Sequence, residues 1–324
     1  MSSEKFFTTK KALITLIAAS LVVIVSLGIR QTFGLFFFDF NADLNISISH
    51  FGFVIGLQLL MWGVFSPIFG FITDRYGGAT AIFIGFLFYL AGLFLFYSGL
   101  NTGYLFTLTI GLLIGIGLGG TAISIPVSVV AKHFPSSNRT IATGIVTCAG
   151  SFGFFVSPLL VRYSLIEIGW EITILYFCFL LGIGLITALF ISTPKTPVGN
   201  NDNNHQTAKE ALIEAFNNKS FIFLTLGFFV CGWHIALVAT HIPTYMMDRG
   251  MPDWTAAMIL ALVGVFNMIG TMGSGYLATK FSKKKVLSAI YLLRGVSLIY
   301  FLYLPPSIFN SVVFGVTFGL LWLS

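Results

Sequence analysis

A short segment that reads Gly70-Phe-Ile-Thr-Asp-Arg-Tyr-Gly77 connects two long apolar runs, at about residues 51–73 and 80–100. A helix needs about 20 mostly apolar residues to cross a membrane, and both runs meet this requirement. Backbone polar groups in lipid must pair within their own segment, which favours a helix for each run. The segment is therefore predicted to be a tight polar turn between two membrane-spanning helices.

The same pattern continues through the whole chain of 324 residues. Nine complete spanning helices and part of a tenth are expected, at approximately 12–37, 51–73, 80–100, 104–131, 139–165, 171–192, 220–246, 255–279, 286–304 and 307 to the end. The alternation typical of membrane β-barrels is absent from the sequence. The expected fold class is an all-α membrane protein.

Composition narrows the class of protein further. The chain is 56% hydrophobic and 9% charged, whereas an ordinary soluble domain carries about 25% charged residues. This excludes a soluble enzyme, a disordered chain and a nucleic-acid-binding protein. The three cysteines are scattered within apolar runs, and no metal, nucleotide or nucleophile constellation is present. Neither an enzyme activity nor a cofactor is expected.

The positive charges predict the orientation in the membrane. The net charge is +6, from 17 basic and 11 acidic residues. With the N-terminus in the cytoplasm, 13 of the 17 basic residues fall in cytoplasmic segments, as the positive-inside tendency requires. Arg162 and Arg249 fall at the outer edge, and Arg30 and Arg294 lie within spans. A multi-pass protein of the plasma (inner) membrane with a cytoplasmic N-terminus is expected.

A polar stretch and an internal repeat divide the chain. Residues 193–219 are rich in Asn and Pro and are predicted to be a cytoplasmic linker. The segment Gly275-Tyr-Leu-Ala-Thr-Lys280 ends the eighth run much as residues 70–75 end the second. Parallel six-helix repeats with a substrate site between the halves are an established transporter plan. The predicted domains are a six-helix bundle (1–192), the linker (193–219) and an incomplete second bundle (220–324).

These features resemble the major facilitator superfamily. The segment 70–77 is similar to the family signature Gly-x-x-x-Asp-Arg-x-Gly after the second helix. Within the family, the stretches 28–36, 229–243 and 264–270 resemble the bacterial monocarboxylate and oxalate/formate-type transporters. The resemblance implies twelve helices in two bundles, with the first, fourth, seventh and tenth lining the cavity. Because only nine helices and part of a tenth are present, we expect a C-terminally truncated sequence.

The sequence departs from the family pattern after the signature. Gly78-Ala-Thr80 stand where basic residues usually follow, so Arg139 is considered as a replacement in the charge relay of the cytoplasmic gate. Drug/proton antiporters fit less well, because the Arg motif of their fourth helix and the Gly-Pro pair of their fifth have no counterpart here. Gly70, Asp74, Arg75 and Gly77 are expected to form a cytoplasmic gate latch, with Asp74 facing a helix N-terminus of the other half.

Charges at membrane depth are costly and are candidates for function. Arg30 lies in the outer part of the first span, where a guanidinium can bind a carboxylate through two hydrogen bonds. The alternatives are that Arg30 extends to the interface or pairs with Asp39. Arg294, in the ninth span, is a candidate second anion clamp. Because ninth helices of the family are peripheral, a structural pairing role is an equal alternative for Arg294.

Two histidines are candidates for binding substrate and carrying protons. His234 and His241 lie seven residues apart on the seventh span, nearly two turns, so both are expected to project from one face. Imidazole titrates near neutral pH and can donate to or pair with an anion. Tyr245, four residues further on, is expected to be a partner or an interfacial anchor. Hydrogen-bonded packing is the alternative for both histidines.

Uncharged hydrogen-bonding side chains complete the candidates. Asn267 in the eighth span, Gln31 in the first and Gln58 in the second can contact substrate or join helices. The function expected is secondary transport of small organic anions, such as monocarboxylates, by alternating access with proton or anion coupling. The partners expected are the bilayer, the anion and protons, in a monomeric protein. Efflux of hydrophobic compounds, a non-transporting membrane protein and an inactive truncated transporter are the alternatives.

Overall fold

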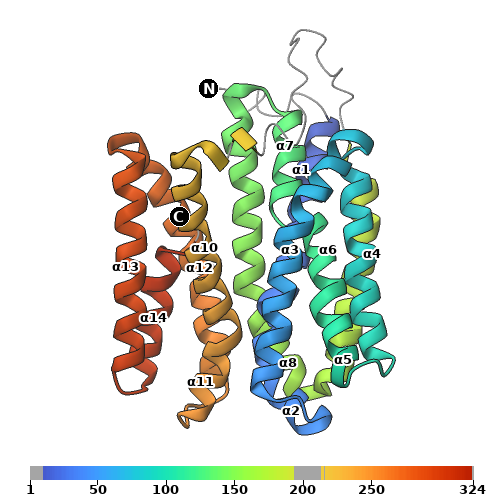
Figure 1. Ribbon diagram of the computed structural model, residues 1–324, viewed down its shortest axis with the longest axis vertical. Coiled ribbons are helices and arrows are strands. Elements are labelled where there is room, and N and C mark those ends of the chain that lie inside the picture. Colours follow the sequence, from blue (N-terminus) through green and yellow to red (C-terminus); the bar gives the residue numbers. More distant parts are fainter. Residues whose placement is uncertain (1–9, 193–212, 215, 323–324) are drawn as a thin grey trace.

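The computed structural model describes residues 10–192, 213–214 and 216–322, and all its regular elements are helical (Figure 1). The helices run roughly side by side along the long axis of the molecule. The expected all-α fold is confirmed for the described part of the chain.

The elements fall before and after the undescribed residues 193–212. The first group is α1 (Lys10–Gln31), the 3-10 helix η2 (Phe33–Phe36), α2 (Phe37–Leu44), α3 (Ile48–Tyr76), α4 (Gly78–Tyr97), α5 (Gly103–Phe106), the π-helix η3 (Thr107–Leu113), α6 (Ile114–Thr121), α7 (Ser124–His133) and α8 (Ser136–Leu189). The second is α10 (Lys219–Ala236), the π-helix η4 (Leu237–His241), α11 (Ile242–Asp248), α12 (Trp254–Lys280), α13 (Lys283–Tyr303) and α14 (Ile308–Leu320).

The long helix α8 contains two of the predicted spans. It has 54 residues, which as a straight helix would extend about 80 Å, far more than the membrane core of about 30 Å. Gly169 has φ 78° and ψ 170°, which breaks the helix into two arms. Ser164 Oγ and Thr173 Oγ1 lie 2.7 Å apart across this break. The arms correspond to the predicted spans 139–165 and 171–192.

The other predicted spans are also helical. Within the described residues, eight helical stretches, with α8 counted once, are long and apolar enough to cross a membrane. The shorter apolar helix α14 occupies the position predicted for the tenth span. The positions of the spanning helices were therefore predicted correctly from hydropathy.

The turn at residues 70–77 is as tight as the sequence predicted. Only Gly77 separates α3 from α4, and its backbone N–H donates to the Thr73 carbonyl oxygen at 3.0 Å. Gly77 has φ 95°, a conformation that side chains with a Cβ rarely adopt. The last glycine of the segment is thus needed by the turn itself.

Helix α6 packs closely between α3 and α4. A Cβ atom on Gly115 would lie 2.6 Å from the Gln58 carbonyl oxygen of α3. A Cβ atom on Gly117 would lie 2.7 Å from the Gly85 carbonyl oxygen of α4. Small residues allow helices in membranes to approach at this distance. Helix α1, which carries Arg30, packs mainly against α8.

Helices α8 and α12 join the two groups of helices along their length. Arg162 Nη2 of α8 lies 3.1 Å from Asp253 Oδ1, at the start of α12. Deeper in the bundle, Asn267 Nδ2 donates to Ser151 Oγ at 2.7 Å. Most of the predicted linker, 193–212 and 215, lies outside the described residues, so the domain boundaries stay a prediction.

Candidate functional site

Arg30 lies in the last turn of α1 and is 3% exposed. Just before it, Ser26 Oγ donates to the Thr121 carbonyl oxygen at 3.2 Å. Tyr89 Oη donates to the Ser26 carbonyl oxygen at 3.4 Å. These contacts place Arg30 in the interior near α4 and α6, and not at a lipid-facing edge.

The Arg30 guanidinium has no hydrogen-bond partner among the described residues: Nε, Nη1 and Nη2 are all buried and unpaired. Pairing with Asp39 and extension to the interface, the two structural alternatives, are therefore both absent from this conformation. An unpaired buried charge costs several kcal/mol. The fork of five N–H donors matches a carboxylate. Within the described residues, no internal partner would compete with an anion for these donors.

The next residue, Gln31, is also buried and unpaired among the described residues. Its side chain is fully buried, and neither Oε1 nor Nε2 has a partner among the described residues. Gln58 differs, because its Nε2 donates to the Ile110 carbonyl oxygen of η3 at 2.9 Å. Gln58 thus joins two helices, as one interpretation of the sequence expected, whereas Gln31 makes no such bond within the described chain.

The turn that follows Gln31 is packed against the second group of helices. A side chain at Gly34 would clash with the Ala239 carbonyl oxygen of η4. Its Cβ would also lie 3.1 Å from the Thr240 carbonyl oxygen and from Pro243 Cγ. Only glycine permits this approach. The end of α1 that carries Arg30 is therefore closed against η4 in this conformation.

His234 and His241 do not share a face, so this expectation was wrong. The π-helix η4 lies between them and has about one residue more per turn than an α-helix, which rotates everything that follows. His241 points toward α3, where a Cβ on Gly52 would lie 3.2 Å from its Cε1. The His234 ring meets Phe318 of α14 edge-on at 6.3 Å, and its Nδ1 is buried without a partner among the described residues.

Tyr245 packs near the end of the seventh span. The Arg249 guanidinium lies 5.0 Å from the centre of its ring, and the ring of Phe301 lies 5.7 Å away on another side. This environment suits the interfacial anchor that the sequence allowed. Substrate contact by Tyr245 stays a prediction.

Arg294 of α13 is buried like Arg30 but fully engaged. Nε donates to the Leu321 carbonyl oxygen at 2.9 Å, and Nη2 donates to the carbonyl oxygens of Leu321 and Trp322. Nη1 donates to Cys231 Sγ of α10 at 3.2 Å. The guanidinium also lies 5.2 Å from the centre of the Tyr291 ring. Arg294 therefore links α13 to α10 and to the residues that follow α14. These contacts agree with the structural pairing role that the sequence analysis gave as the alternative to an anion clamp.

Asn267 joins α12 to α8 through Ser151 Oγ. Thr271 Oγ1 also donates to Asn267 Oδ1 at 3.4 Å. The amide therefore links the two groups of helices, consistent with interhelical bonding. A contact between Asn267 and substrate stays a prediction.

The four residues of the expected gate latch lie around the turn between α3 and α4. Asp74 Oδ1 accepts from Lys132 Nζ of α7 at 2.9 Å, and both side chains are partly exposed. The Arg75 guanidinium lies 5.5 Å from the Tyr76 ring, and no atom lies within 4 Å of a Cβ built on Gly70. Asp74 therefore pairs within the first group of helices, and not with a helix N-terminus of the second.

Lys132 was missed by the sequence analysis, which considered Arg139 as the replacement in the charge relay. The available signal was its position: Lys132 ends the fourth span on the same membrane side as the 70–77 turn. A basic residue at the end of a neighbouring span is a direct candidate for an ion pair with Asp74.

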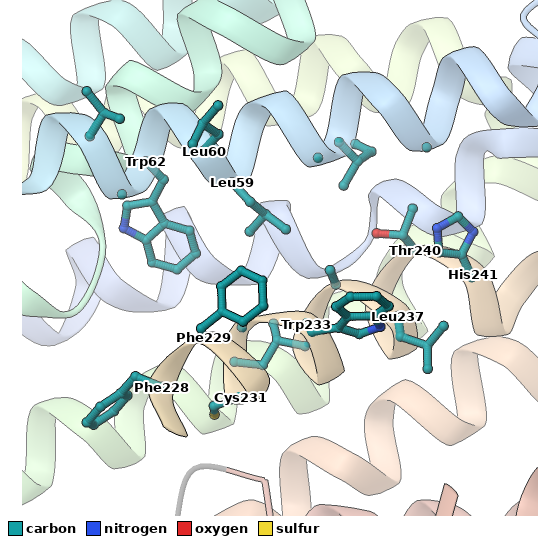
Figure 2. A pocket seen from close by; sticks show the side chains of 18 of the residues that line it. Leu59, Leu60, Trp62, Phe228, Phe229, Cys231, Trp233, Leu237, Thr240 and His241 are labelled. Atoms are coloured by element: carbon teal, nitrogen blue, oxygen red, sulfur yellow. The ribbon is translucent and has the colours of Figure 1, made fainter. Parts of the chain in front are cut away.

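A groove of about 1080 Å³ separates α3 from α10 and η4. Figure 2 shows Trp62 and Leu59 of α3 facing Phe229 and Trp233 of α10 across it. Thr240 and His241 of η4 lie at one end of the groove. The Thr240 carbonyl oxygen also borders Gly34 of η2, four residues after Arg30 in the sequence. A largely apolar groove thus ends beside η2, the short helix that follows Arg30 and Gln31.

Three comparisons place the chain among known proteins. A family model described as Major Facilitator Superfamily matches residues 19–324. The agnestins efflux protein AgnL12 of Paecilomyces divaricatus is 23% identical over 317 residues, which cover 96% of this chain and 70% of that protein. The hexuronate transporter of Bacillus subtilis (strain 168) is 23% identical over 274 residues, or 79% of this chain. Those residues are 62% of that transporter, so the match spans less than two thirds of its length.

The fold is similar to that of a solved transporter. The crystal structure of D-xylose-proton symporter matches with a TM-score of 0.70 and 14% identity, covering 96% of this chain and 80% of that chain. The family model covers nearly all of the sequence and the helical bundle agrees with it. This chain belongs to the Major Facilitator Superfamily of membrane transport proteins.

Proposed function

We propose that this chain is a secondary transporter of small organic anions, such as monocarboxylates, that works by alternating access. The observation that carries the proposal is Arg30, a buried guanidinium with no partner among the described residues. Charged side chains at membrane depth commonly mark substrate pathways. The similarity to a hexuronate transporter supports an anionic substrate, because a hexuronate carries a carboxylate.

Proton or anion coupling supplies the driving force in this proposal. His234 and His241 are the candidate proton carriers, and His241 lines the groove beside Thr240, whose carbonyl oxygen borders Gly34. The xylose-proton symporter fold is compatible with symport. We propose that the N-terminus lies in the cytoplasm, because 13 of the 17 basic residues then fall in cytoplasmic segments. We also propose that the protein is a monomer in the plasma membrane.

The test is uptake of labelled carboxylates by proteoliposomes that contain the 324-residue chain. Saturable uptake is expected, and Arg30→Ala should reduce it to the level of empty liposomes because the anion loses the guanidinium to which it binds. Arg249→Ala, which removes an exposed arginine at a helix end, is the matched control and should transport normally. Absence of saturable uptake, or full uptake by Arg30→Ala, contradicts the proposal.

Efflux of hydrophobic compounds is the second candidate. The apolar groove with Trp62, Phe229 and Trp233 on its walls favours it, as does the similarity to an efflux protein. Transport of a hydrophobic dye by the same proteoliposomes, unaffected by Arg30→Ala and accompanied by no carboxylate uptake, would support efflux over anion transport.

A further inference from the structure

The Gln31 amide lies next to Arg30 in the sequence and narrows the chemistry of a ligand that could bind to both side chains. We propose that the anion bound at Arg30 is a hydroxylated carboxylate whose hydroxyl group pairs with Gln31. The inference rests on the proposed function and narrows its substrate class. It starts from the fact that Gln31 is fully buried and that neither of its side-chain polar atoms has a partner among the described residues.

The missing partner does not depend on how the amide is oriented. The oxygen and nitrogen of a glutamine side chain are hard to distinguish, but both atoms are unpaired here, so a flip changes nothing. Buried polar groups in proteins are almost always hydrogen-bonded. The neighbouring Arg30 is buried and unpaired in the same way. Two consecutive side chains at the end of α1 are therefore buried without hydrogen-bond partners among the described residues, and a bound polar ligand would supply those partners.

The chemistry of the two side chains defines that ligand. Arg30 needs an anion, and Gln31 needs a group that can both donate and accept. A hydroxyl group does both. A second carboxylate would face the Gln31 carbonyl oxygen without a donor, and an ammonium group would be repelled by Arg30. A monocarboxylate that carries a hydroxyl group satisfies both residues.

The helix geometry sets the spacing within the ligand. Consecutive residues of an α-helix project about 100° apart, so Arg30 and Gln31 do not converge on one atom. The hydroxyl group must then lie several bonds from the carboxylate, as in 4-hydroxybutyrate or a sugar acid. Access requires η2 to separate from η4, because Gly34 is packed against the Ala239 and Thr240 carbonyl oxygens in this conformation.

The experiment compares acids that differ by one hydroxyl group. Binding of butyrate, 4-hydroxybutyrate and gluconate to the 324-residue chain in lipid nanodiscs is measured by calorimetry, with empty nanodiscs as the blank. We expect 4-hydroxybutyrate and gluconate to bind about tenfold more tightly than butyrate, since their hydroxyl group gains a hydrogen bond with the Gln31 amide that butyrate cannot make. In Gln31→Met, which has nearly the same shape, 4-hydroxybutyrate and butyrate should bind equally, with butyrate affinity unchanged.

Gln58→Met is the matched control, because Gln58 is equally buried but its Nε2 already donates to the Ile110 carbonyl oxygen, so that Oε1 alone lacks a partner among the described residues. It should keep the tenfold preference. The melting temperature of ligand-free Gln31→Met should not fall, because an unpaired amide stabilises nothing. A lower melting temperature, or a preference that persists in Gln31→Met, overturns the role of Gln31.

The same data separate this inference from the proposed function. Equal binding of butyrate and 4-hydroxybutyrate by the unmodified chain, both lost in Arg30→Met, overturns the hydroxyl requirement and leaves anion binding intact. No binding of any of the three acids overturns the proposed function and this inference with it.

Discussion

Arg30 and Arg294 are both buried arginines within spans, but their surroundings are opposite. Arg30 is 3% exposed and its nitrogens have no partner among the described residues. Arg294 is 2% exposed and donates to two backbone carbonyl oxygens and to Cys231 Sγ. A buried cation that is satisfied by its own protein stabilises the fold, whereas an unsatisfied one destabilises it until a ligand arrives. The contrast supports a structural role for Arg294 and is the basis of the proposed anion-binding role of Arg30.

The largest expected effect on stability comes from Arg294→Met. The substitution leaves the carbonyl oxygens of Leu321 and Trp322 without their charged donor and releases α13 from α10. We expect a loss of about 3 kcal/mol in the free energy of unfolding. Denaturant titration in mixed micelles measures it. An unchanged denaturant concentration at the unfolding midpoint would show that the hydrogen bonds of Arg294 do not stabilise the fold.

A smaller effect is expected from Gly34→Leu, which tests the closure over the Arg30 end of α1. The new side chain cannot fit against the Ala239 carbonyl oxygen, so η2 and η4 cannot pack as they do here. Overpacking of this kind costs about 1–3 kcal/mol. Carboxylate uptake should fall more than tenfold while carboxylate binding at equilibrium persists. Gly144→Leu is the control, since nothing lies within 4 Å of a Cβ on Gly144. Equal uptake by both variants would contradict a closing contact.

The smallest effect is expected from Asp74→Asn. Its ion pair with Lys132 is partly exposed, unlike the contacts of Arg294, and such pairs contribute at most about 1 kcal/mol. The free energy of unfolding should therefore change little, and less so at high salt. Asp248→Asn serves as an exposed control. A loss comparable to that of Arg294→Met would mean that the 70–77 turn is tied together more strongly than its exposure indicates.

Hydropathy predicted the spans because lipid requires long apolar helices wherever the chain crosses the membrane. The tight turn at Gly77 and the helices on both sides of it followed from local sequence alone. The difference between Arg30 and Arg294 did not, because it depends on whether carbonyl oxygens of other helices reach the guanidinium. Both residues look alike in a hydropathy plot, and only the packed helices separate them.

The prediction that His234 and His241 project from one face was wrong for a different reason. A spacing of seven residues implies one face only if the helix keeps 3.6 residues per turn. The π-helix at Leu237–His241 breaks this rule, and it has no simple signature in the sequence. From the sequence, Gln31 was considered together with Gln58 as either a substrate contact or an interhelical hydrogen bond. Its lack of a partner became visible only once the neighbouring helices were in place.

The most direct test of the contrast between the two arginines is the melting temperature of Arg30→Met with and without a saturating carboxylate. The unmodified chain should melt at a higher temperature when gluconate is present, because a ligand that binds only the folded state stabilises it. Arg30→Met should melt no lower than the unmodified chain without ligand and should show no increase with gluconate. If Arg30→Met instead melts as early as Arg294→Met, or retains the full increase with gluconate, Arg30 is not the anion site.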